Sequence, residues 1–137
     1  MQPVPKALVI ELEGEVDGLD PEMGGQCLYR ALPKLDALAD QLGVDPPSNF
    51  WSEDPSQAAA IFDAGGAESA NVVFPPLLLF PAEDGLTSLR ALATYVRAHP
   101  DSVPDASGVI RDLNDCERIL AGAQRYSVQW HFRQEFA

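Results

Sequence analysis

The side chains best suited to chemistry lie at the two ends of the chain. Glu11 and Glu13 stand two residues apart near the N-terminus, and His131 and Arg133 stand two residues apart near the C-terminus. Since residues two apart share a face of a strand, pairing of the two segments would bring all four onto one surface. Opposite charges facing each other across two strands stabilise the pair by about 0.2–1 kcal/mol. We therefore interpret these residues first as structural ion pairs.

The same four residues support two functional interpretations as well. A polar patch of this kind can receive a partner, so Glu11, Glu13, His131 and Arg133 are the predicted binding residues. A carboxylate beside His131 would also favour the protonated ring, which bears on general acid or base catalysis. The sequence gives no evidence of a pocket around them, and we assign no catalytic residue.

Trp51 adds one aromatic candidate to this set. It follows Phe50 in a proline-containing connection rather than in a predicted helix or strand. A tryptophan in such a place either closes the end of a hydrophobic core or stands exposed as an anchor, the role in which Trp is enriched at interfaces. We favour the first interpretation and keep Trp51 as a candidate binding residue.

Other kinds of site lack their motifs. The two histidines form no H-x-x-H or H-E-x-x-H spacing and the two cysteines no C-x-x-C, so no metal site is predicted. The acidic stretch 15–22 lacks the spacing of a calcium-binding loop. The glycine pairs at 24–25 and 65–66 belong to neither a P-loop nor a dinucleotide-binding motif, and no serine lies in a nucleophile elbow. We expect no cofactor.

Two strands must position the candidate residues. Residues 7–13 have leucine or isoleucine at every second position. Residues 127–136 likewise alternate, with Val128, Trp130 and Phe132 as the apolar residues. A period of two is typical of a strand with one buried face. We expect these first and last strands to pair in a small antiparallel sheet, with their apolar sides on the same face.

About four helices are predicted to cover that face, which gives an α+β fold. Pro33 is expected to kink the first helix or to break it in two. Between the helices, residues 72–74 and 77–80 are short extended pieces, and we expect one or both to join the sheet edge. The predicted helices occupy residues 22–42, 56–62, 81–98 and 105–125.

Length and cysteine content set the scale of the molecule. A chain of 137 residues is typical of a single domain, here residues 1–137. Cys27 and Cys116 fall at apolar positions of predicted helices, so we expect two buried free thiols rather than a disulfide. No secretory signal is visible, and no apolar run approaches the ~20 residues that span a bilayer. We expect a cytoplasmic protein.

Charge narrows the choice of partner. The chain has 21 Asp and Glu against nine Lys and Arg, a formal charge of −12. Such a surface repels nucleic acid and anionic membranes, because both bind through cationic side chains. The partner that this charge favours is a basic protein, although strong acidity also keeps a protein soluble without any partner.

Several short segments together suggest a family likeness. They include Gly18-Leu19-Asp20, the helix start from Pro81 to Leu86, and Trp130-His131 in the last strand. With these segments the chain resembles a group of small acidic bacterial proteins of uncharacterised function, over nearly its full length. The resemblance implies the same α+β architecture. It supplies no activity and no catalytic residues.

Three functions from different classes follow from these observations. The first is a small, acidic, non-enzymatic protein–protein interaction module, comparable in size and charge to immunity or inhibitor proteins. The second is a small-molecule-binding protein or enzyme with a site between sheet and helices. The third is a structural homodimer, because unpaired strand edges tend to find partners.

Overall fold

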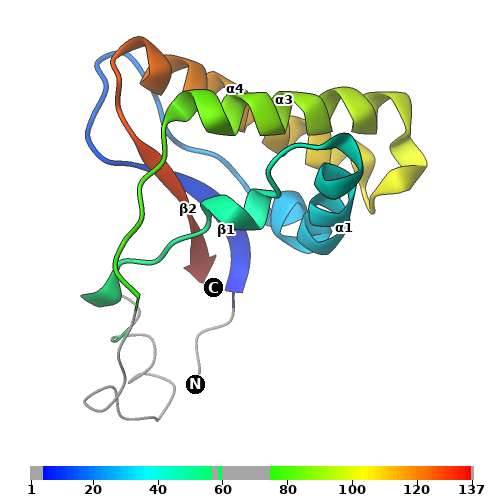
Figure 1. The fold of residues 1–137 in the computed structure, drawn as a ribbon, viewed down its shortest axis with the longest axis horizontal. Helices are drawn as coiled ribbons and strands as arrows, with labels where there is room; N and C mark the ends of the chain where they lie inside the picture. Colours follow the sequence, from blue (N-terminus) through cyan, green and yellow to red (C-terminus); the bar gives the residue numbers. More distant parts are fainter. Residues whose placement is uncertain (1–4, 57–58, 60–74, 137) are drawn as a thin grey trace.

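The computed structural model describes residues 5–56, 59 and 75–136 (Figure 1). Three α-helices lie to one side of a two-stranded sheet, which makes the fold α+β as predicted. Short 3-10 turns at Pro47–Phe50 and Pro100–Ser102 connect the helices. The elements are β1 (Pro5–Leu12), α1 (Gln26–Leu42), α3 (Ala82–Ala98), α4 (Ala106–Arg125) and β2 (Trp130–Phe136).

The two ends of the chain pair as an antiparallel ladder, which confirms the central prediction. Glu11 faces His131 across the ladder, and Ile10 faces Phe132. The far edge of β2 is also occupied, because Phe132 forms an isolated parallel bridge with Trp51, and Trp130 an antiparallel one with Phe80. In the described part of the chain, β2 is therefore the central strand, between β1 and two single-residue bridges.

The helices differ in two ways from the sequence predictions. The expected count of about four is slightly off, since the described residues form three α-helices, and the predicted helix 56–62 lies mostly outside them, as does the extended piece 72–74. The first helix begins at Gln26 and passes through Pro33 without a break. Pro33 lies on the exposed side of α1, where water can satisfy the carbonyl that its missing N–H leaves free. Buried leucines on the opposite side hold the helix to the core.

The core lies between the helices and the inner face of the sheet. Leu8, Ile10, Trp130 and Phe132 project into it and are almost completely buried. A Cβ atom on Gly85 of α3 would lie 2.3 Å from the Trp130 ring, so a glycine there lets the helix approach the indole. The indole N–H donates to the carbonyl of Pro81 at 3.2 Å, which satisfies its one polar group.

The beginning of α1 is held by two aspartates, one within α4 and one at the N-cap of α4. The buried Asp112 carboxylate accepts a hydrogen bond from the backbone N–H of Leu28 at 3.0 Å. Asp105 caps α4 through the N–H of Gly108, and it also accepts from the Cys27 thiol at 3.2 Å. These two hydrogen bonds, the thiol first, lower the pKa of the Asp105 carboxyl below its ordinary value.

Cys27 and Cys116 are free and buried, as predicted. Burial raises the pKa of the Cys116 thiol far above its usual range, because a thiolate there would lose its hydration. Among the described helices, none is long and apolar enough to cross a membrane.

Candidate functional site

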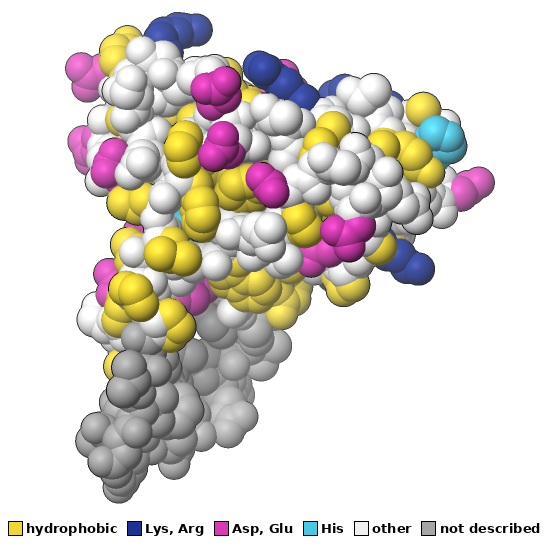
Figure 2. Space-filling model, viewed as in Figure 1, with side chains coloured by type: hydrophobic (Ala, Val, Ile, Leu, Met, Phe, Trp, Pro, Cys, Tyr) yellow, Lys and Arg dark blue, Asp and Glu magenta, His cyan; other side chains and the backbone are white. Residues whose placement is uncertain are grey.

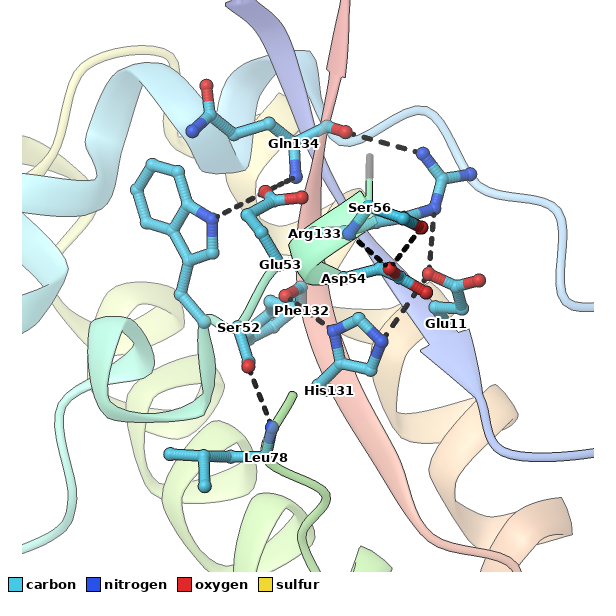
Figure 3. Close-up of polar contacts among 11 residues, drawn as sticks. Glu11, Ser52, Glu53, Asp54, Ser56, Leu78, His131, Phe132, Arg133 and Gln134 are labelled. Carbon is cyan, nitrogen blue, oxygen red and sulfur yellow. Dashed lines mark hydrogen bonds and ion pairs between the residues drawn. The ribbon is translucent and has the colours of Figure 1, made fainter. Parts of the chain in front are cut away.

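Three of the four predicted polar residues meet on the outer face of the sheet, the side away from the helices. Figure 3 shows the His131 and Arg133 side chains of β2 converging on Glu11 of β1. His131 Nε2 and Arg133 Nε each lie 3.4 Å from the same oxygen, Glu11 Oε2. The alternation of β2 causes this arrangement, because Trp130 and Phe132 point inward and the residues between them point outward.

His131 is the most enclosed member of this cluster. Its exposed fraction is 2%, and its Nδ1 lies 3.0 Å from the carbonyl oxygen of Phe132. Both ring nitrogens are therefore within reach of protein oxygens, Glu11 on one side and the backbone on the other. This environment holds the ring in a fixed position between the two strands.

Glu13 does not join the cluster. It lies one residue beyond β1, and its carboxylate accepts a hydrogen bond from the backbone N–H of Gln129 at 3.1 Å. Its own N–H donates to the carbonyl of Gln129. Glu13 thus closes the end of the ladder where the strands separate.

Trp51 lies at the far edge of β2 and packs against the core. The indole is half-buried, contacts Tyr29 edge-on at 6.4 Å and donates its N–H to Glu53 at 2.9 Å. The same Glu53 oxygen accepts the N–H of Gln134, so this side chain continues the edge pairing of β2 (Figure 3). This geometry is that of a core plug, and Trp51 is not among the residues of the pocket described next.

A pocket of about 630 Å³ opens on the outer face, beside the Glu11–Arg133 pair. One wall is formed by β1 and β2 and the other by the connection that follows β1, residues 14–23. Its volume is within the range of roughly 300–1,000 Å³ typical of ligand sites. Glu11 and Arg133 line it, whereas His131, Glu13 and Trp51 do not.

Contacts with α4 hold the connecting loop in place. Arg118 donates to the backbone carbonyls of Asp20 and Glu22, and Leu19 packs so closely on Gly122 that a Cβ atom there would lie 2.8 Å from it. Gly18, with φ +77°, allows the tight turn that precedes Leu19. The loop wall of the pocket is thus attached to the core by backbone and side-chain contacts.

The pocket is strongly acidic. Five carboxylates, those of Glu11, Glu15, Asp17, Glu22 and Glu135, line it together with one guanidinium, which leaves a formal charge of −4. The guanidinium of Arg133 is drawn to Glu11. Within the described part of the chain, no Lys or Arg side chain forms an ion pair with the other four carboxylates.

The same acidity is visible on the surface. Figure 2 shows Asp and Glu side chains along the edge of the molecule where Figure 1 places the loop between β1 and α1. The Lys and Arg side chains visible in that view lie at the upper edge and on the side of the helices. Asp and Glu side chains also lie over the helices in Figure 2, so in this view the acidic side chains are spread more widely than the basic ones.

The arrangement is suited to binding through charge. A cation entering the pocket would meet carboxylates that have no basic partner among the described residues. In those residues, no group of three or more His, Cys, Asp or Glu side chains is placed to hold a metal ion. His131 could act as an acid or base only through Glu11, because it does not line the pocket.

Sequence analysis did not predict this pocket, although one signal was present. Between Lys6 and Arg30 the chain contains six acidic residues and not a single basic one. That stretch covers the whole loop and the outward carboxylate of β1, and from its spacing only a calcium-binding loop was excluded. The contacts of Arg118 and Leu19 that turn the loop into a wall depend on α4, about a hundred residues away in sequence.

Comparison with known proteins found no match. No protein-family model matches the chain, and neither the curated proteins nor the solved structures include one with significant similarity. The resemblance to small acidic bacterial proteins stays a prediction.

Proposed function

We propose that this protein is a non-enzymatic interaction module that binds a basic protein through its acidic face, defined by Glu11, Glu15, Asp17, Glu22 and Glu135. The observation that supports this proposal is the pocket itself, in which five carboxylates meet one guanidinium. An acidic protein that covers a basic partner could neutralise it, as an immunity or inhibitor protein does. The proposed setting is the cytoplasm of a bacterium.

Charge of one sign on one face has two physical consequences. It attracts an oppositely charged partner over distances of about 10 Å at 0.1 M salt, so association is faster than for a neutral surface. It also disfavours anionic partners, because like charges brought together in an interface cost free energy. Both effects decline as salt rises, which makes the proposal testable.

The test is affinity capture from the source cell, followed by measurement with the purified partner. A variant carrying Glu15→Gln, Asp17→Asn and Glu22→Gln removes three charges from the acidic face. The matched control carries Asp40→Asn, Asp101→Asn and Glu83→Gln, three exposed positions outside the pocket. We expect the first to weaken binding at least tenfold at low salt and the control to weaken it less than threefold. Equal losses for both, or a partner that is acidic, would contradict the proposal.

A second candidate is a small-molecule-binding protein or enzyme. The pocket volume and the Glu11–His131 contact support it, since a carboxylate next to an imidazole is a common acid–base pair. The enclosure of His131 argues against direct proton transfer to a pocket ligand. A screen of cationic metabolites by thermal shift would favour this candidate if one compound stabilised the chain and Glu11→Gln abolished the effect.

A homodimer through a strand edge has less support. The outer edge of β2 is occupied at Phe132 by Ser52, at Gln134 by Glu53 and at Trp130 by Phe80. The outer edge of β1 donates from Leu8 to the carbonyl of Gly25. Light scattering that gave a dimeric mass at micromolar concentration would revive this third possibility.

A further inference from the structure

We propose that the pocket receives a single Lys or Arg side chain from the basic partner, with its aliphatic stem against the apolar wall and its charged head among the carboxylates. This inference rests on the proposed function and assigns the place of recognition. The occupant is a segment of a second protein. Three properties of the pocket point to it, namely its mixed lining, the state of Arg133 and the attachment of the loop.

The lining combines an apolar surface with charges, as a long cationic side chain does. Val9, Val16 and Met23 contribute apolar surface from the sheet and from the loop, while Glu15 and Glu22 contribute carboxylates. Lys and Arg place three or four methylene groups between backbone and charge, and they bury the stem while the head stays near water or acid. A small inorganic cation would use the carboxylates and leave the apolar surface exposed.

Arg133 does not fill this role itself. Its Nε lies 3.4 Å from Glu11, and one of its terminal nitrogens donates to the carbonyl of Gln134 at 3.3 Å. Two of its nitrogen atoms are thus directed to the protein (Figure 3). The guanidinium neutralises Glu11 and leaves the other four carboxylates of the pocket for an incoming cation.

The loop wall is already attached before a partner arrives. Arg118 and Leu19 fix it to α4, so binding does not have to order the whole loop. Interfaces whose loops are free are weakened, because each side chain that binding immobilises costs conformational entropy. A wall of this kind favours a specific side chain over diffuse attraction to acid.

The experiment uses three capped tripeptides that differ only at the central residue. The first has lysine, the second 2,4-diaminobutyrate, which keeps the charge but has a shorter side-chain stem, and the third norleucine, which keeps the stem without the charge. Binding to the full chain is followed at pH 6.5 and low salt by the backbone amide shifts of residues 9–23 and 131–135. We expect the lysine peptide to bind about tenfold more tightly than either analogue, because the diaminobutyrate peptide buries about two fewer methylene groups and the norleucine peptide brings no charge to the carboxylates.

A pair of variants locates the site. Glu15→Gln with Glu22→Gln should weaken the lysine peptide at least fivefold, and Asp40→Asn with Asp101→Asn, which removes the same charge from exposed positions outside the pocket, less than twofold. Circular dichroism checks that all variants are folded.

The outcomes separate the inference from the proposed function. Equal affinity of the lysine and diaminobutyrate peptides, or shift changes outside the two segments, overturns the pocket as the recognition site and leaves charge-dependent partner binding in place. Loss of partner binding in the control variant as much as in the acidic-face variant overturns the proposed function instead.

Discussion

The two faces of the sheet are made by the same residues in alternation, yet they have different surroundings. On the inner face, Ile10, Trp130 and Phe132 pack against helices and are almost completely buried. On the outer face, Glu11 and Arg133 retain 42% and 33% exposure of their side chains. The difference shows how one short ladder separates two tasks, since packing on one side fixes the fold and leaves charge on the other side available for binding.

The outer face is nevertheless more than a solvent-exposed side of a strand pair. His131 and Val9 are buried there, and the loop from β1 to α1 rises beside them to form the pocket. Charges in such a partly enclosed place are screened less than those on an open surface. A face that looks merely polar in sequence can therefore hold a defined site.

The strongest test of the comparison is Trp130→Ala on the inner face. Removing a fully buried indole leaves a cavity between α3 and the sheet, and replacements of this kind cost about 3–5 kcal/mol of unfolding free energy. Urea denaturation measures the change. Tyr126→Ala is the control, because Tyr126 is 59% exposed and its removal should alter stability by no more than about 0.5 kcal/mol. Similar losses for the two variants would show that the inner face is not the core.

Much of the inner face was predictable because its signals are local. The alternation of Trp130 with its neighbours indicated a strand, and the first helix ends at Leu42 as predicted, with Gly43 as a left-handed cap. The helix predicted over residues 81–98 also ends at Ala98 in the structure, where His99 is the C-cap and its ring stacks on Tyr95. At Pro33 either a kink or a break was expected, and the continuous α1 excludes the break, because tertiary packing of one side of the helix overrides a local penalty on the other.

The candidate site was predictable only in part. Alternation predicted that Glu11, His131 and Arg133 would share a surface, whereas the register that places Glu11 opposite His131 was not predicted. Burial of His131 and the pocket wall were not predicted either, since both depend on contacts between segments far apart in sequence. Arg118 reaches the carbonyls of the loop from α4, and no local pattern around Arg118 distinguishes it from a solvated arginine.

The next test concerns the end of the loop, where its backbone packs against β1. Gly25 has φ +81°, and a Cβ atom there would lie 2.2 Å from the carbonyl oxygen of Leu8 in β1. Gly25→Ala should cost about 1–3 kcal/mol from backbone strain, with the steric clash adding to it. Gly18→Ala has a similar φ of +77° and nothing within 4 Å, so it reports strain alone. If both variants lose the same unfolding free energy, contact between Gly25 and β1 contributes nothing.

Acid titration asks whether charge also matters on the helix side of the molecule. Hydrogen bonds from the Cys27 thiol and then from the Gly108 N–H lower the pKa of Asp105 below its ordinary 3.8. Its contribution to the free energy of unfolding is therefore complete above about pH 4, and it is lost as the pH falls through the lower pKa of the folded state. Asp105→Asn cannot titrate, so its urea midpoint should change less than that of the parent between pH 5 and pH 2. Asp101→Asn, a nearby exposed control, should keep the parent slope. A steeper slope for Asp105→Asn would contradict the lowered pKa of Asp105.

The smallest change in stability is expected on the outer face, from Arg133→Gln. The pair with Glu11 is partly exposed, and such pairs contribute less than about 1 kcal/mol, so the urea midpoint should barely move. Binding to a basic partner should become stronger, because the pocket loses its one cation. We expect affinity for a basic partner to rise roughly two- to fivefold at low salt, the equivalent of up to about 1 kcal/mol. Lys34→Gln removes the same charge from an exposed position on α1 outside the pocket and should change affinity less. Weaker binding by Arg133→Gln would mean that the partner presents an anion to Arg133, and it would contradict the proposal that the carboxylates of the pocket receive a cation.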